Sequence, residues 1–162
     1  MLFTSSIFWV FFLIVILFLE LNSRVIGSLK IQNLLLLIAS YFFYGYWDWQ
    51  FLSLIFAVSI QTFVAAKIIN DHNALKRIAL TVSIFINLSI LFYFKYANFF
   101  VSELISAFGI ENSFVLENII LPVGISFYIF QSFTYILDVY FGKILPEKDP
   151  LKFFTFIAFF PQ

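Results

Sequence analysis

The 162-residue sequence contains no cysteine, one histidine and few charged residues, which make up 11% of the chain. Without cysteine there is no disulfide framework, no thiolate metal ligand and no cysteine nucleophile. Nine basic residues balance nine acidic ones, so the chain has no net attraction for nucleic acid. Soluble domains are about a quarter charged. The scarcity of charge therefore excludes a soluble enzyme, a disordered chain and a nucleic-acid-binding module.

The sequence is instead 63% hydrophobic and holds 26 Phe, 8 Tyr and 3 Trp residues. A helix needs about 20 mostly apolar residues to cross the roughly 30 Å hydrocarbon layer of a membrane. The runs between charges therefore predict an all-α, multi-pass transmembrane bundle with five complete spans and a truncated sixth. The expected spans are 1–19, 31–47, 49–66, 78–94 and 118–137, followed by one that begins near Phe153 and is cut off at Gln162.

The basic residues predict how these spans are oriented. The segments 20–30, 67–77 and 138–152 fall on one side and hold every Lys and Arg except Lys95. Because basic loops stay in the cytoplasm, we expect these three loops inside and the N-terminus outside. On the outer side, the stretch 98–108 is expected to form a short interfacial helix along the outer leaflet.

Five aromatic residues gather between the second and third expected spans, namely Tyr41, Tyr44, Tyr46, Trp47 and Trp49. Tyr and Trp collect at membrane interfaces. The favoured interpretation is an aromatic belt around a tight helical hairpin, with Gly45 helping the turn. The alternative is a rim that guides a substrate.

A polar stripe runs along the fifth expected span. Gly124, Tyr128, Gln131, Tyr135 and Asp138 recur at alternating spacings of four and three, which places them on one helical face. Unsatisfied polar groups are costly in lipid, so this face should meet protein or water. It is either a set of inter-helix hydrogen bonds or the wall of a polar tunnel. Alternatively, the Asp138 carboxylate could simply extend to the cytoplasmic interface beside Lys143.

The opposite face of this span is apolar and carries Ile125, Ile129, Phe133 and Ile136. The single histidine, His72, lies in a polar turn flanked by basic residues, and we interpret it as a solvated loop residue. No His, Asp and Glu residues have metal-ligand spacing, and no glycine-rich phosphate loop is present. The residues alone therefore predict no catalytic group, no metal and no permanently bound cofactor.

The segment 121–140, LPVGISFYIFQSFTYILDVY, resembles the signature of the membrane-bound O-acyltransferase (MBOAT) family. It is most similar to the bacterial branch of alginate O-acetyltransferases and the D-alanine-transfer membrane protein of teichoic acids. The segments 40–47, 93–100 and 159–162 resemble other parts of that branch. The resemblance implies that residues 1–162 are a single membrane domain, the N-terminal third of such an enzyme.

The resemblance also implies an activity for the full-length protein. It would transfer an acyl group such as acetyl from a substrate, acyl-CoA or a carrier-protein thioester, to a cell-surface or periplasmic glycan. Alginate-like polysaccharide, peptidoglycan and teichoic acid are the acceptors that it suggests. Tyr128, Gln131, Tyr135 and Asp138 would form part of the wall of a tunnel through the bacterial inner membrane. The catalytic histidine of the family matches no residue here, so we expect the chain to be inactive alone.

The partners expected from the resemblance are the lipid bilayer, a glycan acceptor or a periplasmic transferase, and an acyl carrier. A second hypothesis is a non-catalytic membrane bundle that passes an acyl intermediate or serves as a partner subunit. A sixth helix ending within the bilayer would leave carbonyl groups unsatisfied. We therefore expect the isolated chain to be poorly stable or to need a partner.

Overall fold

The computed structural model describes residues 5–108, 122 and 124–160. This described part forms six helices and no strand, which confirms the predicted all-α class. The helices are α1 (Ser6–Val25), α2 (Leu29–Trp47), α3 (Gln50–Asp71), α4 (Lys76–Phe108), α5 (Ile125–Tyr140) and α6 (Pro150–Ile157).

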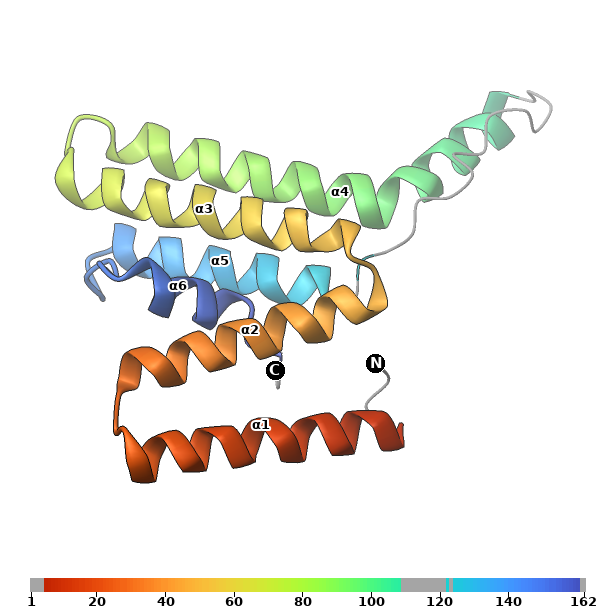
Figure 1. Ribbon diagram of the computed structural model, residues 1–162. Helices are drawn as coiled ribbons and strands as arrows, with labels where there is room; N and C mark the ends of the chain where they lie inside the picture. Colours follow the sequence, from red (N-terminus) through yellow and green to blue (C-terminus); the bar gives the residue numbers. More distant parts are fainter. Residues whose placement is uncertain (1–4, 109–121, 123, 161–162) are drawn as a thin grey trace.

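The helices lie side by side in an elongated bundle (Figure 1). Helix α1 occupies one edge beside α2, the α3–α4 hairpin occupies the other edge, and α5 and α6 lie between them. The connections 26–28, 72–75 and 141–149 gather at one end of the bundle, on the left of Figure 1. The three basic segments therefore share one end, as the alternation of spans predicts.

Three described helices are long and apolar enough to cross a membrane, as a membrane protein requires. They are α1, α3 and the Lys76–Ala97 part of α4. Helix α2 is not among them, because polar residues in its first turn and tyrosines near its end dilute its apolar centre. Helix α5 has only 16 residues. The described residues thus bear out three of the five expected complete spans by length and composition, and the spans expected at 31–47 and 118–137 stay predictions.

Helix α4 is longer than expected. It runs without a break over 33 residues to Phe108, so the prediction of a separate interfacial helix over 98–108 is wrong. Residues 118–121 and 123 of the expected fifth span lie outside the described residues. Helix α5 begins at Ile125, directly after Gly124, whose φ of 74° lies in the left-handed region that favours glycine.

Helix α6 is shorter than expected and begins earlier. Pro150 occupies its first turn, and the side chain of Asp149 accepts a hydrogen bond from the Leu151 amide at 3.0 Å. The helix ends at Ile157 after eight residues, where the Ala158 amide donates to the Phe154 carbonyl. The prediction of a span that continues as a helix is therefore wrong for the described residues 158–160.

The hairpin between α2 and α3 also differs from the expectation. Helix α2 continues through Gly45, and the turn follows at Asp48 and Trp49. Gly45 instead allows close packing, because a Cβ at this position would lie 3.0 Å from the Leu52 Cδ1 atom. Glycine here serves the contact between the two helices rather than the turn.

The main core lies among α3, α4, α5 and α6. Its central side chains include Val58, Ile129 and Ile136, all 0% exposed. A smaller cluster joins α1 to α2 and to Phe160, which stacks edge-on against Phe11 with ring centroids 5.3 Å apart. Helix α5 therefore occupies the centre of the larger core.

Candidate functional site

A groove of about 430 Å³ runs along α5, beside α6 and the 141–149 connection. Three of the four residues predicted to line a tunnel, Gln131, Tyr135 and Asp138, line this groove. The rest of its wall is formed mainly by apolar side chains, namely Phe127, Phe130, Thr134, Ile144 and Phe156. One side of the groove is therefore polar, and the other is aromatic and aliphatic.

Gln131 holds the end of α6 in place. Its Nε2 donates to the Phe156 carbonyl oxygen at 2.9 Å. The last carbonyls of a helix have no intrahelical partner, and the Phe160 amide, the normal donor to Phe156, donates instead to the Ser40 Oγ at 3.2 Å. Gln131 thus satisfies an orphan carbonyl. Its own Oε1 is buried and has no hydrogen-bond partner.

Tyr135 and Asp138 hold the connection that follows α5. The Tyr135 hydroxyl accepts a hydrogen bond from the Glu147 amide at 2.8 Å. The Asp138 carboxylate lies 3.2 Å from the Lys143 Nζ, which matches the alternative that this carboxylate sits beside a nearby lysine. Both residues therefore support the groove as well as line it.

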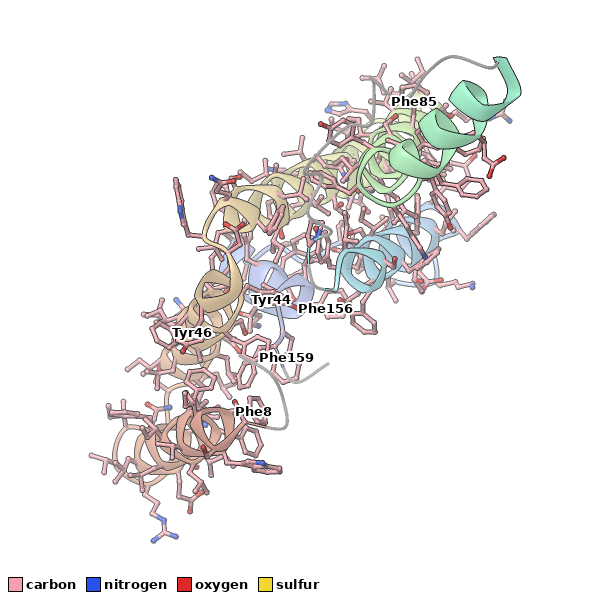
Figure 2. The ribbon with its side chains drawn as sticks, turned by 90° about the vertical axis from the view of Figure 1, so that its right-hand side faces the viewer. Phe8, Tyr44, Tyr46, Phe85, Phe156 and Phe159 are labelled. Carbon is pink, nitrogen blue, oxygen red and sulfur yellow. The ribbon has the colours of Figure 1, made fainter. Side chains whose placement is uncertain are left out.

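Tyr128, the fourth predicted residue, does not line the groove. It is 1% exposed within the core, and its hydroxyl has no hydrogen-bond partner. It packs near Tyr44 of α2, whose hydroxyl would lie 3.7 Å from a Cβ at Gly124. Figure 2 shows Tyr44 and Phe156 between α2 and α5. The stripe thus divides into a part buried against α2 and a part that faces the groove.

The aromatic residues between α2 and α3 also divide. Tyr41 and Tyr44 are half-buried, and the Tyr41 hydroxyl is buried without a hydrogen-bond partner. Tyr46 and Trp49 point outward with 55% and 73% of their surfaces exposed. The outward pair fits an interfacial belt, and the inward pair fits a wall behind the start of α5, so both interpretations stay predictions.

The apolar face of α5 packs inside the protein. Ile125, Ile129 and Ile136 are buried in the main core, whereas Phe127 and Phe130 are about half exposed. The periodicity of α5 was therefore informative about which residues share a face. The periodicity of α5 could not predict that Phe156 and Ile144 line the groove or that the Glu147 amide bonds Tyr135. These contacts depend on how α6 and the connection before it fold back against α5.

Sequence reasoning also missed a polar contact between α3 and α4. The Ser83 hydroxyl donates to the Gln61 Oε1 at 3.0 Å. One turn further along α4, Asn87 is 0% exposed, and neither its Nδ2 nor its Oδ1 has a hydrogen-bond partner. An unpaired amide in a core is costly, and the absence of charge and of a polar stripe around it hides this feature in the sequence.

The one carboxylate that lines the groove, that of Asp138, is paired with Lys143. His72 lies exposed in the α3–α4 turn and does not line the groove. Within residues 5–108, 122 and 124–160, no three His, Asp or Glu side chains are grouped to hold a metal ion. The arrangement can hold an elongated, mostly apolar ligand and donate or accept hydrogen bonds along one side.

Similarity to known proteins extends over the whole chain. It is 40% identical to the probable alginate O-acetylase AlgI of Azotobacter vinelandii and 40% identical to that of Pseudomonas aeruginosa, each over 100% of the chain. It is 32% identical to the peptidoglycan O-acetyltransferase of Helicobacter pylori over 80% of the chain. No protein-family model and no solved structure matches the chain.

The chain spans about a third of the length of the curated relatives it matches, namely 33%, 31% and 29% of these three proteins. They are bacterial proteins named as O-acetylating enzymes. The predicted resemblance of the chain to the bacterial O-acetyltransferase branch is therefore confirmed.

Proposed function

We propose that this chain is the N-terminal third of a membrane-bound O-acyltransferase and that the α5–α6 groove forms part of its substrate passage. The observation that carries the proposal is the 40% identity to an alginate O-acetylase across the full length of the chain. The position of Gln131, Tyr135 and Asp138 along one groove supports a role in binding substrate.

The reaction proposed for the complete protein is the transfer of an acetyl group to a hydroxyl group of a cell-surface or periplasmic glycan. The hydroxyl oxygen attacks the carbonyl carbon of an acyl thioester, the C–S bond breaks, and the hydroxyl proton passes to a general base. No residue of this chain is proposed as that base. The role proposed for this chain is to position the substrate and exclude water.

The lining of the groove fits the donor side of such a reaction. Phe127, Phe130 and Phe156 offer apolar surface to the methylene and methyl groups of an acyl thioester. The donor class proposed is acyl-CoA or a carrier-protein thioester.

The setting proposed is the inner membrane of a bacterium. The three basic connections would face the cytoplasm, and the N-terminus would lie outside. Asp138 and Ile144 place one end of the groove near these basic connections. A donor made in the cytoplasm would therefore enter the groove from the side where it is available, and the glycan acceptor would approach from the other.

The test uses a gene that encodes the complete protein. Thr134 is exposed in the groove, so Thr134→Trp should fill the passage without disturbing the core. We expect the ester-linked acetate on the glycan, released by mild alkali, to fall at least about tenfold, as a misplaced substrate does. The amount of protein in the membrane should stay the same.

The matched control is Val82→Trp, which adds the same ring at a 50% exposed position on α4, outside the groove. We expect it to retain acetylation. Gln131→Leu keeps a similar volume and removes both hydrogen-bonding groups, so we expect a loss between those of the two tryptophan variants. Full acetylation with Thr134→Trp would overturn the role of the groove. Absence of glycan acetylation with the unaltered gene would overturn the enzyme itself.

A further inference from the structure

A second pocket lies at the end of the bundle where the basic connections gather. It has a volume of about 820 Å³ and opens between the α3–α4 turn and the end of α5. Six residues line it, namely Asn73, Ala74, Lys76, Arg77, Tyr140 and Phe141. None of them lines the α5–α6 groove, so this pocket is separate from the proposed substrate passage.

The two cations of this pocket have no anionic partner within the described part of the chain. The ion pairs there join Arg24 to Glu20 and Lys143 to Asp138, and neither includes Lys76 or Arg77. Asp71, the acidic residue that ends α3, accepts a hydrogen bond from the Asn70 side chain. Neither cation of the pocket is therefore held in an ion pair within the described residues, which leaves both available to an anionic ligand.

An aromatic ring holds one of these cations in place. The Lys76 Nζ lies 4.6 Å from the centroid of the Tyr140 ring, in a cation–π contact. Lys76 is half-buried, whereas Arg77 is exposed. The lysine is thus positioned before any ligand binds, and the arginine can supply two parallel N–H donors to phosphate oxygens.

The rim of the pocket is apolar and exposed. Phe141, which lines the pocket, is 66% exposed, and Leu145 on the same connection is 84% exposed. The pocket also lies at the end of α3 and at the start of α4, two helices long and apolar enough to span a membrane. A cationic pocket beside exposed apolar side chains, at membrane-interface depth, matches a headgroup phosphate that continues into acyl chains.

We propose that this pocket binds the phosphate group of one anionic phospholipid. Lys76 and Arg77 contact the phosphate oxygens, and the acyl chains lie along Phe141. The bound lipid joins the α3–α4 turn to the end of α5 and so holds the basic end of the bundle together. This site is independent of acyl transfer and takes a ligand that stays in the membrane.

The test is native mass spectrometry of the complete protein, expressed from its full gene, in detergent micelles titrated with phosphatidylglycerol or phosphatidylcholine. We expect one tightly bound phosphatidylglycerol per chain and no matching site for the zwitterionic lipid. In the double variant Lys76→Gln with Arg77→Gln, the affinity should fall by about 30-fold, since each basic residue near an anionic headgroup contributes about a factor of five. Circular dichroism checks that the helices remain.

The control double variant, Lys30→Gln with Lys67→Gln, removes the same charge from the same end of the bundle. Both lysines are exposed and lie outside the pocket, so we expect less than about a threefold loss. Tyr140→Leu keeps the charge but frees Lys76, and should weaken binding by about two- to fivefold.

Equal losses in the two double variants would show diffuse surface charge and overturn the proposal. Displacement of the lipid by millimolar inorganic phosphate would show that the pocket prefers a soluble phosphate, which would overturn the lipid as ligand. Retained binding in the Lys76 and Arg77 double variant would overturn the pocket itself.

Discussion

Helices α1 and α5 show opposite relations between composition and position. Helix α1 has the highest mean hydropathy of the three candidate spans, 2.2, yet only 17% of its span is buried. Its buried residues, Phe8, Val15 and Asn22, recur every seven positions and form a single line of contact. Helix α5 carries polar residues on most of its turns, and it lies among α3, α4 and α6.

This difference follows from the membrane as a solvent. Lipid tails are as apolar as leucine, so apolar surface gives a helix no reason to leave the lipid for the protein interior. Hydrogen bonds and close packing do give such a reason. The polar groups of α5 therefore favour its central position, whereas the mostly apolar α1 gains less from leaving the lipid.

The largest expected effect comes from truncating an isoleucine at the centre of α5. Ile129 is 0% exposed, so Ile129→Ala should lower the free energy of unfolding by about 2 kcal/mol or more, because a cavity remains. Leu13 on α1 is 64% exposed, and lipid can fill the space, so Leu13→Ala should cost less than about 0.5 kcal/mol. Titration with a denaturing detergent, followed by circular dichroism, measures both. Equal costs would show that the two helices are packed alike.

A smaller effect of opposite sign is expected on α4, at the one described asparagine whose amide is 0% exposed and unpaired on both atoms. Asn87→Leu keeps a similar volume and removes this uncompensated amide, so it should raise the free energy of unfolding by about 1 kcal/mol. The same detergent titration reports it. A loss of stability would mean that the amide has a partner in the membrane, such as an ordered water.

The smallest effects are expected at two glycines where the difference between α1 and α5 should disappear. Gly27 precedes α2 at φ 63° and Gly124 precedes α5 at φ 74°. An alanine at either position pays about 1 kcal/mol for the left-handed backbone, whatever surrounds it. Gly27→Ala and Gly124→Ala should therefore lower the free energy of unfolding by the same amount. Gly45→Ala is the control. It should cost less free energy of unfolding than the other two substitutions, because the backbone at Gly45 is helical and the Leu52 side chain can move away. A much larger cost at Gly124 would show that packing, not the backbone, decides there.

The sequence was sufficient for the features that depend on local periodicity. Charge spacing located α2 and the starts of α3 and α4 to within two residues, but it placed α1 about five residues too early and missed that α4 continues to Phe108. The spacing of four and three grouped Gln131, Tyr135 and Asp138 on one face of α5. The same spacing also grouped Tyr128 with them. It could not separate Tyr128 from the groove, because the position of α2 decides that.

The features that depend on distant contacts were missed or wrong. The eight residues of α6 look like the start of a span, and their length is set by Pro150 and by hydrogen bonds to α2 and α5. The Gln131–Phe156 hydrogen bond joins residues on different helices, so no pattern within α5 predicts it. Gly45 was assigned to a turn because glycine favours turns, whereas its role depends on Leu52 of the next helix.

The length of α4 has a consequence for the membranes in which this protein can work. Lys76 and Lys95 are about 28 Å apart along an ideal helix, which is close to the roughly 30 Å thickness of a bilayer hydrocarbon layer. The residues beyond Ala97 continue the helix but turn away from the bundle, at an angle to the first part of α4 (Figure 1). In a thinner bilayer, the Lys76–Ala97 part of α4 would have to tilt. The tilt would move the far end of α4 sideways, so a change in bilayer thickness would change the position of that end.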